Sequence, residues 1–195
     1  MARLPAARRR AQLLDVALEL FASKGYHQAS MHEIAEAAGV TKPVLYQHFA
    51  SKEELYLELL RDVSTRLNQA VSEATASAAG PREQVENGFR AFFRFVADKP
   101  ARFGILFAEA TRRIPEFHTE VARIERTISS NIASLIVVEG MDDEHRQLLA
   151  YGIVGMAEVT CRQWTEGGVD VDDSDALAAQ VAELAWTGLR GVRQV

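Results

Sequence analysis

The stretch "SMHEIAEAAGVTKPVLYQHF", residues 30–49, has the pattern of two short helices joined by a tight turn. "SMHE" is a capping box, in which the Ser30 hydroxyl accepts a hydrogen bond from the Glu33 amide while the Glu33 side chain reaches back. The small residues of "AAGV" (37–40) allow the two helices to cross closely. This arrangement predicts a helix-turn-helix, the motif that presents its second helix to the major groove of DNA.

The second short helix is not a strong helix by propensity, and it carries polar side chains that no core requires. Thr41 is expected as its N-cap, which puts Pro43 in the first turn, where a missing N–H costs nothing. Leu45 and Phe49 lie four residues apart, so they share a face and are expected to pack on apolar residues earlier in the chain. The segment therefore has one face for a core and one face for a partner.

The outward face, which includes Pro43, has the chemistry of a DNA-reading surface. Gln47 can pair bidentately with an adenine edge, and Val44 can meet a thymine methyl group. The groups able to donate to phosphates on this face or beside it are Lys42, Tyr46 and His48.

Helical periodicity continues on both sides of this pair, and Gly and Pro separate the apolar runs. A first helix is expected over residues 6–24, with Gly25 as its C-terminal stop. "SKEE" (51–54) is a second capping box and opens a long helix to about residue 77. The chain is therefore predicted to be all-α, with further helices over 81–98, 99–113, 115–138, 143–166 and 176–193.

Charge and composition limit the class of protein. Residues 1–52 hold seven Lys/Arg and four Asp/Glu, a balance of +3, whereas the remainder carries a balance of −8. A basic first segment on an acidic body suits a nucleic-acid partner at one end only. The single cysteine, Cys161, excludes an internal disulfide and fits a reducing cytoplasm, although a redox-sensing role stays open. No run is long and apolar enough for a membrane span, so a soluble cytoplasmic protein is expected.

Residues 13–60 resemble the DNA-binding domain of the TetR family of bacterial transcriptional regulators. The resemblance rests on "A-x-x-x-F-x-x-x-G-Y" (17–26), "I-A-x-x-A-G-V" (34–40) and "L-Y-x-H-F-x-x-K-E-x-L" (45–55), in the family's order and spacing. It implies a helix-turn-helix DNA-binding domain over residues 1–52. It also implies a six-helix effector-binding and dimerisation domain over residues 53–195.

The resemblance further implies which residues face phosphates or bases. Pro43 and Val44 stand where glycine and threonine are common in the family, so base preference is expected to differ there. "ARRR" (7–10) is expected either as an N-terminal extension that reaches phosphates or as a solvated tail. The implied contacts at the start of the second helix, along the third and just beyond it are Ser30, His32, Thr41, Lys42, Tyr46, His48 and Lys52.

Two later segments predict a dimer. "YGIVGMA" (151–157) is apolar on all sides, and the last helix has an apolar stripe wider than one interior face requires. Together they resemble the family's four-helix interface, and a twofold dimer matches a palindromic operator. An ordinary core is the alternative. The interface residues expected are Tyr151, Gly152, Gly155, Met156, Val181, Leu184 and Leu189.

Seven of the nine phenylalanines lie between residues 89 and 117. Aromatic residues at helical spacing more often form a core than a ligand site. By resemblance, however, this region surrounds a pocket for a small apolar effector. The pocket residues expected are Phe89, Phe92, Phe93, Phe103, Phe107, Glu109, His118 and Trp164, with Arg112 and Arg123 as further polar groups.

The sequence therefore predicts a homodimeric repressor, associated with the nucleoid, that binds a palindromic operator on double-stranded DNA and is released by a small apolar effector. The alternative is a DNA-binding structural or partner-recruiting protein without an effector. No Gly-rich phosphate loop, serine nucleophile elbow or metal-spaced histidine pair occurs, so neither an enzyme, a cofactor nor a metal site is predicted.

Overall fold

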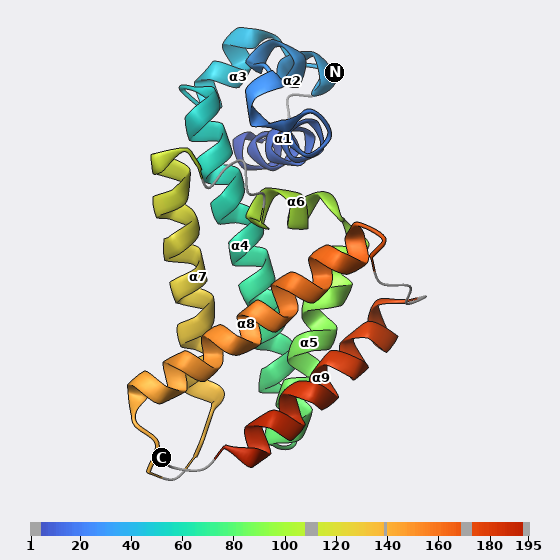
Figure 1. Ribbon diagram of the computed structural model, residues 1–195. Helices are drawn as coiled ribbons and strands as arrows, with labels where there is room; N and C mark the ends of the chain where they lie inside the picture. Colours follow the sequence, from blue (N-terminus) through green and yellow to red (C-terminus); the bar gives the residue numbers. More distant parts are fainter. Residues whose placement is uncertain (1–4, 108–112, 139, 169–172, 193–195) are drawn as a thin grey trace. The chain divides into compact units, whose positions relative to one another are not determined.

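The computed structural model describes residues 5–107, 113–138, 140–168 and 173–192, and these ranges contain nine α-helices and no strand (Figure 1). This agrees with the predicted all-α fold. In chain order the helices are α1 (Ala6–Gln28), α2 (Met31–Ala37), α3 (Lys42–His48), α4 (Lys52–Ala76), α5 (Pro81–Asp98), α6 (Ala101–Phe107), α7 (Pro115–Leu135), α8 (Asp143–Thr165) and α9 (Ser174–Gly191).

Most helix ends lie within about two residues of the predicted ends. The exceptions are the end of α1, at Gln28 instead of 24, and the end of α7, at Leu135 instead of 138. Gly25 leaves helical geometry with φ 76° and ψ 162°, as a stop residue should, but one more turn follows it up to Gln28. The last helix begins at Ser174 because the Asp173 side chain accepts from the Ala176 amide and caps it. The helix predicted over 99–113 is described as α6 as far as Phe107, and residues 108–112 lie outside the described ranges.

The chain forms two compact units, and α4 and α7 contribute to both. We name Met1–Ser64 with Ala101–Val121 the head unit, and Thr65–Pro100 with Ala122–Val195 the body unit. These are units of packing. The division of function at residues 52 and 53 stays a prediction.

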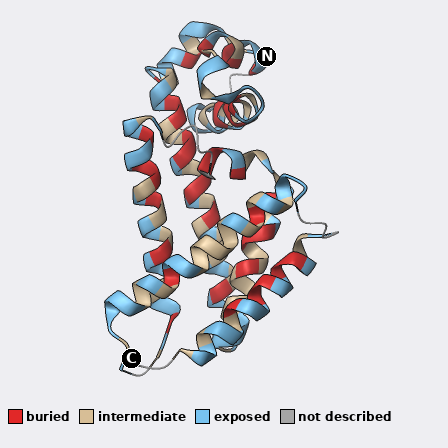
Figure 2. Ribbon diagram, viewed as in Figure 1, coloured by how far each residue is buried: buried red, intermediate tan, exposed pale blue. Residues whose placement is uncertain are grey.

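The core of the head unit is the buried side of α1, on which α2 and α6 pack. Figure 2 shows buried residues along α1. Among them Leu13, Ala17 and Phe21 are at most 3% exposed, as their spacing predicts. Near the end of α1, the Tyr26 ring contacts Phe21, Tyr56 and Phe117 at centroid distances of 4.8–6.0 Å. This aromatic cluster joins α1 and α4 to the first turn of α7 through edge-on and tilted rings.

In the body unit, α5 packs along α9, and α8 contacts both of them. The buried residues of α5 include Phe89 and Phe93, and those of α9 include Leu177 and Val181. Two exposed ion pairs at the rim also join α5 to α9: Arg82 with Glu183, and Arg94 with Asp175. None of the described helices is long and apolar enough to cross a membrane.

Candidate nucleic-acid interface

The predicted capping box at the start of α2 is present. The Glu33 amide donates to the Ser30 hydroxyl at 3.3 Å, and the Ser30 amide donates to the Glu33 carboxylate at 2.9 Å. Lys24 of α1 donates to the same carboxylate at 2.6 Å. The Lys24 ammonium and the Ser30 donors together lower the pKa of Glu33 to about 2. The box therefore starts α2, and Lys24 ties that start to α1.

The turn after α2 takes the form that its glycine predicts. Gly39 has φ 65°, and the Val40 amide donates to the Ala35 carbonyl at 2.9 Å, which satisfies a carbonyl at the helix end. The Gln12 side chain of α1 donates to the Ala38 carbonyl at 3.3 Å. The turn that separates α2 from α3 is thus held on α1 as well.

The helix α3 starts and packs largely as predicted. Thr41 occupies the N-cap position and Pro43 lies in the first turn, but the Thr41 side chain makes no capping hydrogen bond. Backbone geometry at Thr41 and the preset φ of Pro43 start this helix. Leu45 and Phe49 are both 0% exposed, so the buried face is the predicted one.

The predicted DNA-contacting residues are on the surface of the head unit. Tyr46 is 48% exposed, which is high for a large aromatic side chain. Ser30, at the capping box, is half-buried, and so are Val44 and His48 on α3. The other exposed members of the predicted set are His32, Thr41, Lys42, Pro43 and Gln47.

Lys52 has internal partners that sequence reasoning missed. Its ammonium group donates to the carbonyls of Tyr26 at 2.8 Å, Ala29 at 3.0 Å and His27 at 3.4 Å. It also lies 4.4 Å from the centre of the Tyr26 ring. Lys52 therefore holds the extra turn after Gly25 against the start of α4. Its predicted contact with phosphate stays a prediction.

Arg8, Arg9 and Arg10 lie inside α1, so "ARRR" is part of a helix and not a solvated tail. Its predicted reach to phosphates stays a prediction. Arg9 donates to Gln12 at 2.7 Å. Arg10 donates to the His48 carbonyl at 3.1 Å and to the Glu58 carboxylate at 2.8 Å. Sequence reasoning missed this role because the partners are 38 and 48 residues away.

The phenylalanines predicted to line an effector pocket are divided between the two units. In the body unit Phe89, Phe92 and Phe93 are at most 8% exposed, and half-buried Trp164 lies edge-on to Phe93 with centroids 6.4 Å apart. In the head unit Phe103 is 7% exposed and His118 is on the surface. Phe107 is the last residue of α6, and Glu109 and Arg112 lie outside the described residues.

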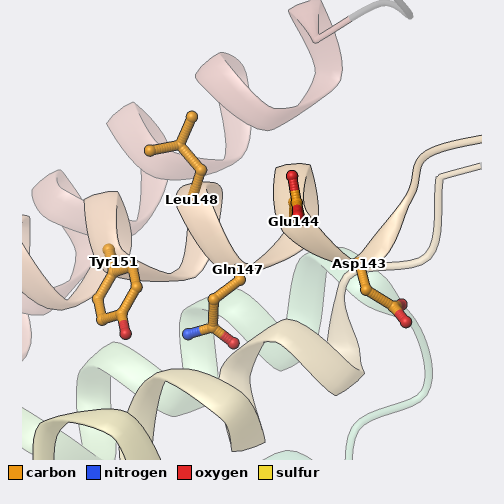
Figure 3. Close-up of a pocket in the computed structure, with 5 residues that line it drawn as sticks. All are labelled: Asp143, Glu144, Gln147, Leu148 and Tyr151. Carbon is orange, nitrogen blue, oxygen red and sulfur yellow. The ribbon is translucent and has the colours of Figure 1, made fainter.

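A pocket of about 480 Å³ lies on α8 and opens broadly to solvent (Figure 3). Gln147 in its wall donates to Ser129 of α7 at 2.7 Å. None of the predicted effector-binding residues lines this pocket, but Tyr151, a predicted interface residue, does. Its lining consists of Asp143, Glu144, Gln147, Leu148 and Tyr151.

The predicted interface helices expose large apolar side chains. On α8, Leu148, Tyr151 and Val159 are 67%, 45% and 49% exposed, and on α9 Leu184 is 67% exposed. No residue of 151–157 is buried, although the stretch is apolar on all sides. Of the other residues predicted for this interface, Gly152 is exposed, Gly155, Met156 and Leu189 are half-buried, and Val181 is buried.

Comparison with known proteins agrees with this architecture. Residues 13–59 match the model for bacterial regulatory proteins of the tetR family, and residues 81–188 match that for the tetracyclin repressor-like C-terminal domain. The chain belongs to the TetR family and is a helix-turn-helix, DNA-binding transcriptional regulator. The predicted family is thereby confirmed.

Two relatives differ in the sign of regulation. The HTH-type transcriptional activator FasR of Mycolicibacterium smegmatis is 34% identical over 191 residues, which cover 97% of this chain and 87% of FasR. The HTH-type transcriptional repressor KstR2 of Mycobacterium tuberculosis is 36% identical over 104 residues, which cover 53% of this chain and 52% of KstR2.

Solved structures share the fold over nearly the whole chain. A TetR-like transcriptional regulator from Rhodococcus sp. RHA1 superposes with a TM-score of 0.79 at 30% identity, covering 97% of this chain and 100% of the other. The regulator FadR of Bacillus subtilis, solved in complex with stearoyl-CoA, gives a TM-score of 0.80 at 22% identity, covering 94% and 99%. The likeness to FadR is one of fold alone.

Proposed function

We propose that this chain acts as a homodimeric repressor that binds a palindromic operator through α2 and α3. The observation that carries the proposal is the division of α3 into two faces. Leu45 and Phe49 are fully buried, while Lys42, Tyr46 and Gln47 are exposed. A helix of seven residues held in this way presents donors for phosphates and base edges on a rigid support.

Dimerisation is proposed through α8 and α9. Leu148, Tyr151, Val159 and Leu184 are large apolar side chains on these two helices that a single chain leaves exposed to water. A second copy would cover them. The twofold axis of such a pair would place two α3 helices for two half-sites, which is why a palindromic operator is expected.

The effector is proposed to be a small apolar molecule bound within residues 53–195. The FadR structure indicates that this fold can hold stearoyl-CoA, and the buried Phe89, Phe92 and Phe93 would suit an acyl chain. An effector releases DNA only if it binds the DNA-incompetent state more tightly. FasR is an activator and KstR2 a repressor, so a promoter fusion must establish the sign of regulation.

A gel-shift assay tests the DNA-binding face. The duplex probe is one that the wild-type protein selects from a randomised library. Replacing Lys42 and Tyr46 by alanine should abolish the shift without changing the mass of the assembly in solution. Arg126→Ala, which removes one exposed cation from α7, is the control and should leave the shift intact. Undiminished binding by the double variant would refute the proposed interface.

A second candidate function is a DNA-bound structural or partner-recruiting protein without an effector. It is favoured by the tight burial of Phe93, which is 0% exposed and meets the rings of Phe89, Phe92 and Trp164. A thermal-shift screen with fatty acids and acyl-CoAs separates the two candidates, since a ligand that binds the native state raises Tm. If no compound raises Tm or weakens the gel shift, the second candidate is favoured.

A further inference from the structure

Arg10 joins three elements of the head unit through one guanidinium group. It belongs to α1, donates to the His48 carbonyl of α3 at 3.1 Å, and donates to the Glu58 carboxylate of α4 at 2.8 Å. The guanidinium carbon also lies 4.4 Å from the centre of the Phe49 ring. Two different nitrogens of the planar fork make the two hydrogen bonds, Nη1 to His48 and Nη2 to Glu58. A lysine at this position would have a single nitrogen in place of the two.

The contacts of Arg10 fall on the end of α3. His48 is the last residue of this helix and Phe49 is its C-cap. A helix of seven residues does not hold itself together in water, so its direction depends on what fixes its ends. The cation at the carbonyl end also suits the helix dipole. Arg10 thus fixes the carboxyl end of the helix proposed to enter the major groove.

Glu58 fixes Arg10 in turn. One carboxylate oxygen of Glu58 accepts from Arg10, and the other accepts from Arg61 at 3.1 Å. Arg61 donates to Glu120 of α7 at 3.2 Å, and the Glu120 side chain is only 8% exposed. The guanidinium of Arg10 is therefore held between Glu58 and the end of α3, and a phosphate would have to compete with both.

We propose that Arg10 is a positioning residue for operator recognition: it sets the direction of α3 without contacting DNA. Glu58 acts with it, by holding the guanidinium. This inference rests on the proposed function, because it needs a specific operator to be recognised. The rival explanation is that Arg10 belongs to a basic surface that contacts phosphates directly.

Two variants, one that keeps the charge and one that changes it, separate these explanations. Arg10→Lys keeps the charge but loses the fork, and Glu58→Gln removes a negative charge that would repel DNA. Positioning predicts that each weakens binding to the selected duplex by about tenfold, the scale of one hydrogen bond to a charged group. Binding to a random-sequence duplex should not weaken in either variant, since non-specific binding is electrostatic and needs no aligned helix. Glu36→Gln, which removes the same charge from an exposed side chain of α2, should weaken neither.

Salt dependence and a double variant complete the test. The slope of log Kobs against log salt should be the same for wild type and Arg10→Gln, whereas loss of a phosphate contact would reduce it by about 0.9. Arg10→Lys combined with Glu58→Gln should be no weaker than either alone, because both break one unit. Circular dichroism establishes that helix content is retained. If one single variant does not fold, the other decides the outcome.

Four results would each overturn the inference. They are wild-type affinity in Arg10→Lys, tighter binding in Glu58→Gln, a reduced salt slope in Arg10→Gln, and additive losses of affinity in the double variant. Failure of the proposed function looks different. In that case the wild-type protein selects no sequence from the library, and no specific duplex exists against which variants can be compared.

Discussion

At the scale of single residues, several charged side chains of the head unit have internal partners. Lys24 pairs with Glu33, Arg10 pairs with Glu58, and Lys52 donates to the carbonyls that follow Gly25. Exposed pairs of this kind add little stability each. Here they connect different helices, so their effect is on where α2, α3 and α4 lie. A count of positive residues in the first 52 positions therefore does not show that several of them already have partners within the head unit.

Glu33 predicts a pH dependence of stability. The pKa of Glu33 is lowered to about 2 in the folded protein, from about 4.5 in the unfolded chain. Its contribution to the free energy of unfolding is therefore present above pH 4.5 and is lost as pH falls towards 2. Glu33→Gln retains a capping box but not the ion pair with Lys24. The urea midpoint of wild type should exceed that of Glu33→Gln at pH 7, and the difference should shrink between pH 4.5 and 2. A difference that is constant across this range would contradict the prediction.

Cys161 predicts an inert thiol. The side chain is 0% exposed, and burial raises its pKa to about 12. Because the thiolate is the reactive form, a disulfide reagent at pH 8 should modify the native protein only at the rate of its unfolding. In urea one thiol per chain should react with the reagent at once. The Cys161→Ala variant should not react with it, either in the native state or in urea. Rapid modification of the native protein would restore the redox-sensing alternative.

At the scale of elements, the backbone at Gly25 lets the chain leave α1 and still add one more turn. Its φ of 76° and ψ of 162° lie where side chains are rarely tolerated, although no atom within 4 Å would meet an added Cβ. The cost of replacing it is therefore one of backbone strain and not of a clash. The three carbonyls that accept from Lys52 all follow this residue.

Gly25→Ala should lower the free energy of unfolding by about 1–3 kcal/mol, the range for a residue held in a rarely populated backbone region. Gly104→Ala is the matched control. Gly104 lies in α6 of the same unit, has no positive φ and has open space at the Cβ position, so alanine there should stabilise by up to about 1 kcal/mol. Urea unfolding of both variants measures the contrast. Equal effects would show that φ at Gly25 is not the cause.

At the scale of the whole molecule, the proposed dimer depends on apolar side chains that one chain leaves exposed. Leu184 of α9 is 67% exposed, and Tyr151 of α8 is 45% exposed. Exposure alone does not identify an interface, because single apolar residues are common on surfaces. Val137, which follows α7, is 87% exposed and is not part of the predicted interface.

Leu184→Glu should weaken the dimer by about a hundredfold, since an unpaired charge buried at an interface costs about 3 kcal/mol. Val137→Glu adds the same charge in the body unit and should leave the dimer unchanged. Light scattering across a concentration series gives both dissociation constants. A Leu184→Glu protein that remains dimeric at all concentrations would remove α9 from the proposed interface.

The local sequence was sufficient to predict the helices and most of the candidate nucleic-acid interface. The capping box at Ser30 and Glu33, the turn at Gly39, the burial of Leu45 and Phe49 and the place of Pro43 depend on residues within about one helical turn of each other. Hydrogen-bonding capacity and periodicity act over that distance, so they can be read from the chain directly. The exposure of Tyr46 and Gln47 follows from the same periodicity.

Contacts between side chains of different helices could not be predicted in this way. Arg10 reaches Glu58 across 48 residues, Arg61 reaches Glu120 across 59, and Phe117 meets Tyr26 although a cluster of neighbouring phenylalanines suggested a pocket. Which side chain meets which across such separations depends on the path of the whole chain, and no local pattern encodes it. The sequence by itself determined the family, the helices and the outward face of α3. Only the tertiary structure decided which charges hold that helix in place.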